Sequence, residues 1–531
     1  MVRRLIAVFI LIVCALAAGV AQQAASAPPA PFDALIVNGR VLDGAGNPWV
    51  HADVGIRGGR IAAMGRLEGA KAARVIDAAG RYVAPGFIDA HTHAGEGLVR
   101  KGLEQGQPLL AQGITTAVVN PDGGGPVDLA GQRATYETQG LGVNVAQLVG
   151  FGSVRRAVLG GADRSPTDEE LAKMKALVRR AMEEGAFGLS SGLFYAPQTF
   201  AATGEVIEMM KVVAEFGGLH TSHIRDEGDY ATGVVESVQE IIQIAEATGT
   251  RGIVTHMKAL GPDNWGLSMA CTMRMDAARA RGVEVFADQY PYEASSTSLV
   301  AAVVPRWAQA GGDAEMRKRL ADPALREKLR AEMRENLRRR GGPASIVIAH
   351  YGPDHGLEGQ SVGEIARKGG LAPEDAVLDL IGRANASVVS FNMSERDIEH
   401  IMRQPYTMSS SDGGLVLMSE GKPHPRNYGA FPRKLARYVR ERGVVPLEFA
   451  IRSMTTLPAL VFGLTDRGAL REGAWADIVV FDLDAVRDTA TYTNPHQLAQ
   501  GMSYVLVNGA VVVDNGAFTS ALPGKVIRPE P

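Results

Sequence analysis

The chain has 531 residues, of which 46% are hydrophobic and 21% are charged. This composition is typical of a globular protein, so it excludes a disordered or collagen-like chain, and the length suffices for a large domain plus a smaller one. The 55 Lys and Arg residues against 58 Asp and Glu residues give a net charge of -3. No overall basic field therefore indicates nucleic acid or an anionic membrane as a partner, and any chemistry must come from a local site.

Residues 1–21 have the order of a secretory signal peptide, because two arginines precede an apolar run that ends near Ala18 and gives way to small residues. A membrane helix is the alternative, but spanning takes about 20 apolar residues, and glutamines interrupt this run too soon. We expect cleavage after Ala21, with Ala27 as a second option. The mature protein is then periplasmic or secreted, with no membrane attachment. Its single remaining cysteine, Cys271, excludes an internal disulfide.

Both ends of the mature chain show the pattern of short strands. A Pro/Ala-rich linker, residues 22–33, precedes the first such segment, residues 34–84, and the second covers residues 466–531. Each contains the pattern Val-Asn-Gly-x-Val, in which Asn-Gly is a hairpin turn signal. We therefore predict one small β-sandwich domain built from both termini.

Residues 85–465 predict a TIM (β/α)8 barrel within an α/β fold. Short apolar runs alternate here with helical stretches, as in βαβ units. Eight runs lead into polar residues, namely YVAPGFIDAHTH, ITTAVVNPD, NVAQLVG, AFGLSSG, GLHTSH, GIVTH, VEVFADQY and YTMSSSD. Two further runs, SIVIAH and ASVVSF, do not fit this count. Residues about 300–345 are expected to form a charged, amphipathic helical insertion.

Polar residues at the ends of these runs predict a metal site, because barrel chemistry gathers at the C-terminal ends of the strands. His91 and His93 are two positions apart, so both face the same side of a strand. His223 and His256 end the fifth and sixth runs, and Asp412 ends the eighth. Separate structural histidines are the alternative, but one shared mouth favours zinc or a similar divalent ion, which imidazole and carboxylate ligate.

Longer segments resemble the N-acyl-D-amino-acid deacylases, or D-aminoacylases, of the amidohydrolase superfamily. They are GITTAVVNPDGG, GAFGLSSGLFYAP, HTSHIRDEG, THMKALGPDNWG, DQYPYEASST, SSSDGG, HPRNYGAFPR and MTTLPALVFGLTDRGALREGAWADIVVFD. The resemblance extends from about Leu35 to Val512. It implies metal-dependent hydrolysis of the amide bond of N-acyl-D-amino acids, which releases a carboxylate and a free D-amino acid.

The resemblance also implies the metal ligands, which are His91, His93, His223, His256 and Asp412, holding one or two divalent ions, zinc in the family. The family bridges its metals with a cysteine in a GNCG motif, where this chain has Asn120-Pro121-Asp122-Gly123. Asp122 can bridge two ions through its carboxylate, or it can be a turn residue only. Oxygen in place of sulfur weakens the selection for zinc and admits manganese or iron.

The mechanism implied by this ligand set is hydrolysis by water activated on the metal, since the ion lowers the pKa of a bound water from about 15.7 toward 7. Asp412 is expected to take the proton from this water and pass it to the leaving amine. The resemblance assigns the free carboxylate of the substrate to Lys258, Tyr290, Ser296 and Arg426. It places Tyr195 near the acyl amide, and we expect Arg225 beside the metal site.

Three other histidines are weaker candidates. His220 is expected to be packed or on the surface, whereas His350 and His424 are possible pocket residues. A dipeptidase or a cyclic-amide hydrolase of the same superfamily is the alternative function, because the metal chemistry is shared. A non-catalytic binding protein on a barrel scaffold is the alternative of a different class. The acyl group, the side-chain preference, the metal and the oligomeric state stay open.

Overall fold

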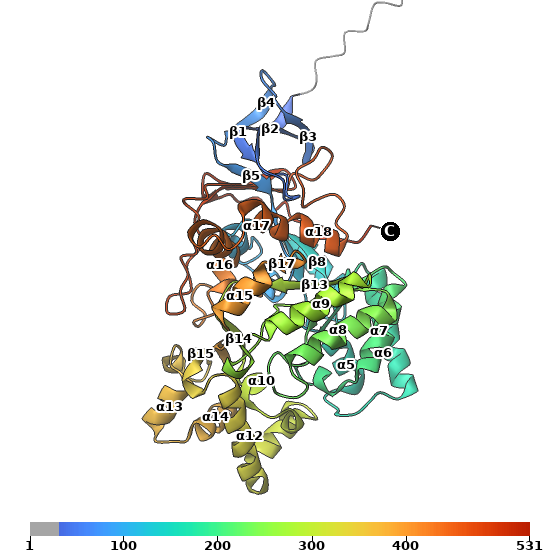
Figure 1. Ribbon diagram of the computed structural model, residues 1–531, viewed down its shortest axis with the longest axis vertical. Coiled ribbons are helices and arrows are strands. Elements are labelled where there is room, and N and C mark those ends of the chain that lie inside the picture. Colours follow the sequence, from blue (N-terminus) through green and yellow to red (C-terminus); the bar gives the residue numbers. More distant parts are fainter. Residues whose placement is uncertain (1–30, 531) are drawn as a thin grey trace, which may run out of the picture.

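The computed structural model describes residues 31–530, so the predicted signal peptide and most of the predicted linker lie outside the described residues. No helix within this range is long and apolar enough to cross a membrane. The molecule is elongated, with a β-domain at one end, a barrel in the middle and a helical subdomain at the other end (Figure 1).

The barrel is built from the eight predicted runs, which confirms the predicted fold class. Its strands are β6 (Phe87–Asp89), β7 (Ile114–Val119), β8 (Asn144–Gln147) with β9 (Val149–Gly150), β10 (Gly188–Gly192), β11 (Leu219–His223), β12 (Arg251–Val254), β13 (Val285–Gln289) and β17 (Thr407–Ser409). Neighbouring strands pair in parallel. The loops after β17 and β6 close the ring, since the Asp412 amide donates to the His91 carbonyl at 2.9 Å.

Amphipathic helices cover the outside of the barrel (Figure 1). They are α2 (Ala94–Leu98), α3 (Gln107–Leu110), α4 (Leu129–Gln139), α5 (Phe151–Leu159), α6 (Asp168–Glu183), α7 (Thr203–Ala214), α8 (Val234–Thr248), α9 (Ser268–Ala280), α15 (Glu395–Met402), α16 (Arg426–Arg433), η7 (Lys434–Glu441), α17 (Leu447–Met454) and α18 (Thr456–Phe462). Helix α6 begins with a capping box between Thr167 and Glu170. Ile241 of α8 and Met209 of α7 are fully buried, so the helices and strands share one core.

The β-domain joins both ends of the chain, as the repeated strand pattern predicts. Its strands are β1 (Phe32–Val41), β2 (Val50–Arg57), β3 (Arg60–Gly65), β4 (Ala72–Asp77), β5 (Tyr82–Pro85), β18 (Ile478–Phe481), β19 (Met502–Val507), β20 (Ala510–Asp514) and β21 (Ala517–Phe518). They form one continuous nine-stranded sheet in which β5 pairs with β18. The last strand, β22 (Val526–Ile527), instead pairs with barrel strand β8. The predicted range 466–531 is therefore too long at its C-terminal end.

The insertion is larger than the predicted helical segment of about 300–345. It extends from β14 (Ala294–Ser298) to β16 (Ser387–Phe391), which pair with β15 (Ile346–His350) in an antiparallel sheet. The helices α10 (Leu299–Val303), α11 (Asp313–Ala321), α12 (Arg326–Arg339), α13 (Val362–Gly369) and α14 (Pro373–Arg383) pack on it around a core of their own. The two unassigned runs are β15 and β16. The sequence alone could not assign these two runs to the insertion, because the position of a strand in a sheet depends on pairing with residues that are distant in the chain.

Candidate active site

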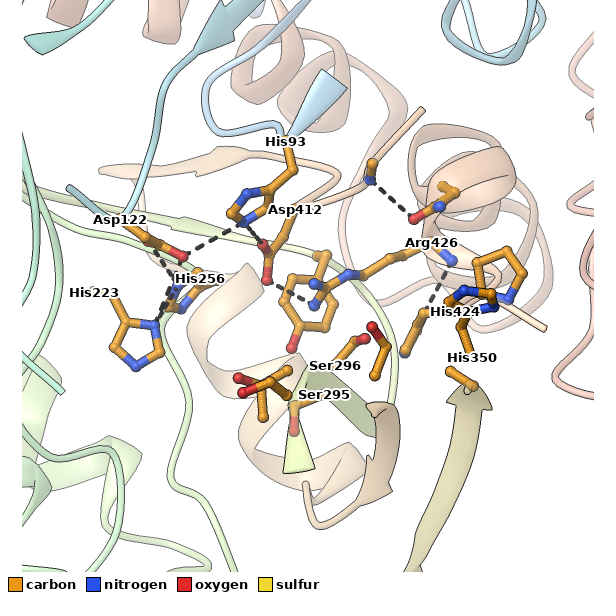
Figure 2. A pocket seen from close by; sticks show the side chains of 18 of the residues that line it. His93, Asp122, His223, His256, Ser295, Ser296, His350, Asp412, His424 and Arg426 are labelled. Carbon is orange, nitrogen blue, oxygen red and sulfur yellow. Dashed lines mark hydrogen bonds and ion pairs between the residues drawn. The ribbon is translucent and has the colours of Figure 1, made fainter. Parts of the chain in front are cut away.

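A cavity of about 520 Å³ lies at the C-terminal ends of the barrel strands. One wall consists of the residues that follow the strands, and another comes from the insertion, chiefly from β14 (Figure 2). The residues after the strand ends thus form a polar wall of the cavity. The insertion completes the cavity with a second wall that does not come from the barrel.

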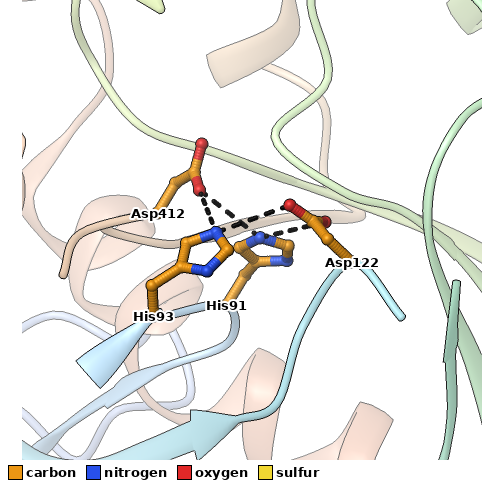
Figure 3. Close-up of side chains that lie close together, drawn as sticks. All are labelled: His91, His93, Asp122 and Asp412. Carbon is orange, nitrogen blue, oxygen red and sulfur yellow. Dashed lines mark ion pairs between the residues drawn. The ribbon is translucent and has the colours of Figure 1, made fainter. Parts of the chain in front are cut away.

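Four predicted ligands lie close together at the strand ends (Figure 3). The Nε2 atom of His91 lies 3.5 Å from Asp122 Oδ1 and 3.5 Å from Asp412 Oδ1. The Nε2 atom of His93 lies 3.4 Å from Asp122 Oδ2 and 3.2 Å from Asp412 Oδ1. One ligand atom from each of these residues lies within 4.8 Å of every other, a grouping that one divalent ion can occupy.

A second group shares Asp122 with the first. His256 Nε2 lies 3.5 Å from Asp122 Oδ1, and His223 Nδ1 lies 4.0 Å from Asp122 Oδ2. The two imidazoles approach each other at 3.0 Å between His223 Nδ1 and His256 Nε2. Asp122 is therefore the one residue common to both groups, which is the position that a bridging carboxylate must hold.

Three of the predicted ligands have an unusual backbone conformation. Asp122, His256 and Asp412 have φ values of 56°, 34° and 49°, in the left-handed region that non-glycine residues rarely adopt. Each such conformation costs about 1–3 kcal/mol and persists only where the surroundings enforce it. All three residues lie two or three positions after a barrel strand ends, where the chain changes direction at the cavity.

The donor set fits a divalent metal. His91 Nε2 and Asp122 Oδ1 are buried and have no hydrogen-bond partner within residues 31–530. Buried polar atoms are rarely left unpaired, because each then retains the cost of lost hydration. Carboxylate oxygens and imidazole nitrogens are ordinary ligands of zinc and also of manganese and iron.

The electrostatics favour positive charge at the same place. Burial would raise the pKa of Asp122, but His91 and His256 hold it well below the ordinary value. Burial lowers the pKa of His93, yet its contacts with Asp122 and Asp412 raise it to about 9. The two ionised carboxylates thus attract either a proton or a metal ion to the imidazoles.

Buried carboxylates behind the ligands hold the ligand-bearing loops in place. Asp288 Oδ1 accepts hydrogen bonds from the His256 amide at 2.8 Å and from Ser410 Oγ at 2.6 Å. Asp89 Oδ1 accepts one from the Ser411 amide at 2.8 Å, and burial raises the pKa of Asp89 to about 7. Sequence reasoning missed both residues, although each lies at the C-terminal end of a predicted barrel strand.

Glu227 is the most consequential residue that the sequence prediction missed. Its Oε1 atom lies 3.0 Å from His256 Nδ1 and also pairs with Lys258 Nζ, and its Oε2 atom lies 3.8 Å from His223 Nε2. The carboxylate therefore pairs with one predicted ligand, His256, and with the predicted substrate-binding residue Lys258, and it lies near a second ligand, His223. The available signal was its place in the segment HTSHIRDEG, four positions after His223.

The five residues expected to hold the substrate carboxylate and acyl amide all line the cavity; they are Tyr195, Lys258, Tyr290, Ser296 and Arg426. Arg426 begins helix α16, and its Nη1 atom lies 2.6 Å from Asp412 Oδ2. Its guanidinium lies over the Tyr290 ring, at 4.7 Å from the centroid. The ring of Tyr195 lies 4.6 Å from that of His223. The predicted carboxylate site therefore adjoins the predicted metal site.

Arg225 does not line this cavity and pairs instead with Glu240. Its Nε and Nη2 atoms donate to Glu240 at 2.9 and 2.7 Å, and its Nη1 atom donates to the Thr199 carbonyl. The reason is that β11 ends at His223. The side-chain alternation of a strand therefore does not extend to a residue two positions later.

The three weaker histidine candidates lie in different environments. His220 is buried and lies 2.8 Å from Ser191 Oγ through its Nε2 atom, as expected for a packed residue. His350 and His424 both line the cavity. His424 Nε2 donates to the Ala294 carbonyl at 2.9 Å, so it supports the wall made by β14.

Known proteins resemble this chain over nearly its whole length. A family model described as "Amidohydrolase family" matches residues 74–513. N-acyl-D-glutamate deacylase of Alcaligenes xylosoxydans xylosoxydans is 39% identical over 94% of this chain and 96% of its own length. D-aminoacylase of the same organism is 35% identical over 94% and 98%.

Solved structures agree with these relatives. N-acyl-D-glutamate deacylase of Bordetella bronchiseptica, in complex with zinc and a phosphonate inhibitor, is 36% identical and has a TM-score of 0.80, covering 94% of this chain and all of that one. A D-aminoacylase described with a binuclear metal centre is 33% identical, with a TM-score of 0.81 over the same shares. From these matches and the shared barrel, the chain belongs to the amidohydrolase family, in the branch of the N-acyl-D-amino-acid deacylases.

Proposed function

We propose that the protein is a metal-dependent hydrolase that cleaves the amide bond of N-acyl-D-amino acids. The observation that carries this proposal is that six metal-type ligands, five of which line the cavity, lie together beside a buried arginine and lysine suited to a carboxylate. The named activities of the relatives support the same substrate class. The D configuration rests on those relatives alone.

The ligand set divides into two groups that share Asp122, so the site suits one or two divalent ions, with zinc the first candidate. When bound, such an ion lowers the pKa of a coordinated water and polarises the scissile carbonyl. The protein's own part is to hold imidazoles and carboxylates in position. Asp89, Asp288 and Glu227 do this from behind.

Asp412 is the group that moves a proton. Burial would raise its pKa, but Arg426 and His256 hold the pKa of this carboxyl well below its ordinary value, so it enters the reaction ionised. An ionised carboxylate can accept a proton from the attacking water. It can then donate that proton to the nitrogen of the departing amino acid, which leaves as a neutral amine.

Arg426 and Lys258 bind the carboxylate that every N-acyl amino acid carries. The Nε atom of Arg426 is buried and has no hydrogen-bond partner among the described residues, so it is available to a ligand. Arginine matches a carboxylate with two parallel hydrogen bonds. Tyr290 supports both cations, since its ring lies below Arg426 and 5.8 Å from Lys258 Nζ.

The experiment that tests this function uses purified protein of measured metal content. It is assayed on matched N-acetyl-D- and N-acetyl-L-amino acids, with dipeptides and cyclic amides as competing substrate classes. Hydrolysis of N-acetyl-D-amino acids in preference to all others is the expected result. Metal-replete protein that hydrolyses no N-acyl-D substrate, or prefers a dipeptide or a cyclic amide, contradicts the proposal.

We also propose that the protein acts in the periplasm or outside the cell, because residues 1–21 have the order of a signal peptide. N-terminal sequencing of the protein recovered from each cell fraction tests this. Mature protein that begins at residue 22 or 28 in the periplasmic or extracellular fraction is expected. Full-length protein in the cytoplasmic fraction contradicts it.

A further inference from the structure

We propose that the insertion carries an auxiliary metal site, in which His350, His355 and Glu358 bind one divalent ion of the zinc type. These residues belong to the segment HYGPDHGLE, which begins at the last residue of β15. They form a group of potential ligands that shares no residue with the groups at the barrel strand ends. The inference is independent of the proposed function, because it concerns other side chains and a bound ion rather than a reaction.

The first observation is that two imidazoles meet at one carboxylate oxygen. His350 Nδ1 lies 3.0 Å from Glu358 Oε1, and His355 Nδ1 lies 2.8 Å from the same atom. One ligand atom from each residue lies within 4.8 Å of every other. Around a tetrahedral zinc ion with bonds of about 2.0–2.1 Å, ligand atoms lie about 3.3 Å apart. The nitrogen–oxygen separations therefore need to widen by only a few tenths of an ångström to admit the ion.

Local structure brings the three residues together. His355 and Glu358 are three positions apart across the turn η6 (His355–Leu357), a 3₁₀ helix, in which such residues lie on the same side. The Glu358 amide closes this turn by donating to the His355 carbonyl at 3.2 Å. His350 ends β15 next to a β-bulge, an irregularity that changes the direction of a side chain. The cluster thus depends on two short backbone features within nine residues of sequence.

The alternative is a hydrogen-bonded cluster without a metal, which satisfies these side chains poorly. Glu358 Oε1 also accepts the Tyr351 amide at 3.1 Å, so three donors converge on one oxygen that has two lone pairs. A divalent ion removes this competition, because each imidazole then binds through Nδ1 and keeps its proton on Nε2. The imidazoles of His350 and His355 have exposed fractions of 50% and 66%, so an ion can reach them from solvent.

The donor types decide which ion is bound and how tightly. Two imidazoles and one carboxylate favour zinc, copper or nickel over magnesium or calcium, which prefer oxygen ligands. The site offers three protein ligands, whereas a structural zinc site has four. Lys422 lies against Gly359, the residue after Glu358, and its positive charge opposes the ion. We therefore expect the site to fill only after the ligands at the barrel strand ends are saturated.

An ion at this site affects the catalytic cavity through His350, which lines it (Figure 2). The preceding residue, Ala349, accepts a hydrogen bond from the Lys422 amide at 2.6 Å. Lys422 lies in the loop after β17, which supplies Glu420 and Pro423 to the same cavity. Coordination of Nδ1 fixes the ring of His350, and it thereby fixes one part of the cavity wall.

The test maps the reactivity of individual histidines in the wild-type holoenzyme. Zinc is titrated into the protein, and modification by diethyl pyrocarbonate is quantified for each histidine by peptide mass spectrometry. Modification of His350 and His355 should be lost together, at one zinc concentration, because a coordinated nitrogen no longer reacts. Magnesium should protect neither residue. His51, an exposed histidine that lies against Trp49 in the β-domain, is the internal control and should stay reactive.

Two variants test whether the ion is shared. His355→Gln should abolish the protection of His350 at the zinc concentration that protects it in wild type. Glu358→Gln should raise the zinc concentration for half protection at least about 100-fold, because even a partner behind a metal ligand contributes about 10- to 100-fold to affinity. The matched control is Glu315→Gln, which removes a carboxylate of the same insertion that pairs with Lys318. It should leave the titration unchanged, and melting temperatures are recorded for all variants.

Wild-type protein in which saturating zinc leaves either His350 or His355 reactive overturns the inference, even if no variant folds. Protection of His350 that persists in a folded His355→Gln protein also overturns it, because the two residues then do not share an ion. Neither result bears on the proposed function, which the substrate assay tests separately. Equally, a protein that hydrolyses no N-acyl-D-amino acid leaves this metal site standing.

Discussion

Replacing Asp412 with asparagine keeps the shape of the side chain and removes both its charge and its capacity to carry a proton. The carboxylate has an exposed fraction of 5% and lies 2.6 Å from Arg426, 3.2 Å from His93 and 3.5 Å from His91. It thus contacts two groups of the predicted metal set and one of the substrate set. No other carboxylate of the cavity contacts Arg426 within the described chain.

The expected loss follows from this position. A positioned acid or base contributes about 10²- to 10⁴-fold to turnover. Because the proposed mechanism uses Asp412 for both proton transfers, we expect a fall in kcat near the upper end, about 10³- to 10⁴-fold. This corresponds to about 4–5.5 kcal/mol at 1.36 kcal/mol for each factor of ten. The loss should appear in kcat more than in KM, since Arg426 and Lys258 remain to bind the substrate carboxylate.

The assay measures kcat and KM on an N-acyl-D-amino acid that wild type hydrolyses, at equal metal occupancy for both proteins. The matched control is Asp397→Asn. Asp397 is buried to a similar degree and accepts hydrogen bonds from the Ser268 hydroxyl and the Gly266 amide, away from the cavity. It should lose stability but keep its turnover. An Asp412→Asn protein that retains its metal and turns over within about tenfold of wild type refutes the proton-transfer role.

Three further predictions concern the metal, pH and the core. Asp122→Cys should favour zinc over manganese at least about tenfold more than wild type does, because thiolate is the softer ligand; unchanged competition between the two ions refutes this. Burial lowers the pKa of Lys434 from 10.5 to about 7, so between these values the unfolded chain binds a proton that the folded chain does not, and stability falls as pH falls. The melting temperature of Lys434→Met should therefore rise relative to wild type as pH decreases from about 10 to 7, and a constant difference contradicts this. Arg155→Met leaves the buried Glu205 without its ion-pair partner at 3.0 Å, and it should lower the free energy of unfolding, measured with denaturant, by about 3–5 kcal/mol. A double variant with Glu205→Met that is no more stable than the single variant contradicts this prediction.

The barrel and most of the candidate site could be predicted from local sequence features. Each barrel strand is a short apolar run that leads into a polar residue, and parallel strands of a barrel place their C-terminal ends at one face. His91, His93, His223, His256 and Asp412 could therefore be expected to meet without any knowledge of the loops between them. The pairing of the two chain ends was equally visible, because the same Val-Asn-Gly-x-Val pattern occurs in both.

Features that depend on non-local pairing could not be predicted this way. The strands β15 and β16 belong to the insertion because they pair with β14, and nothing within either run indicates that partner. Arg225 faces Glu240 because the strand alternation stops at His223. Glu227 contacts both His256 and Lys258 because the loop after β11 lies against the loop after β12, where the Leu260 amide donates to the Glu227 carbonyl at 2.7 Å.

The sequence by itself determined the class of chemistry, because it places metal-ligating residue types at the ends of predicted strands. Both features can be recognised from local sequence patterns. Only the tertiary structure decided that Asp122 belongs to both ligand groups and that Arg340, from the insertion, lines the same cavity. The physical reason is that the role of a charged side chain depends on the residues around it. The neighbours of a buried side chain are set by packing between elements far apart in the chain.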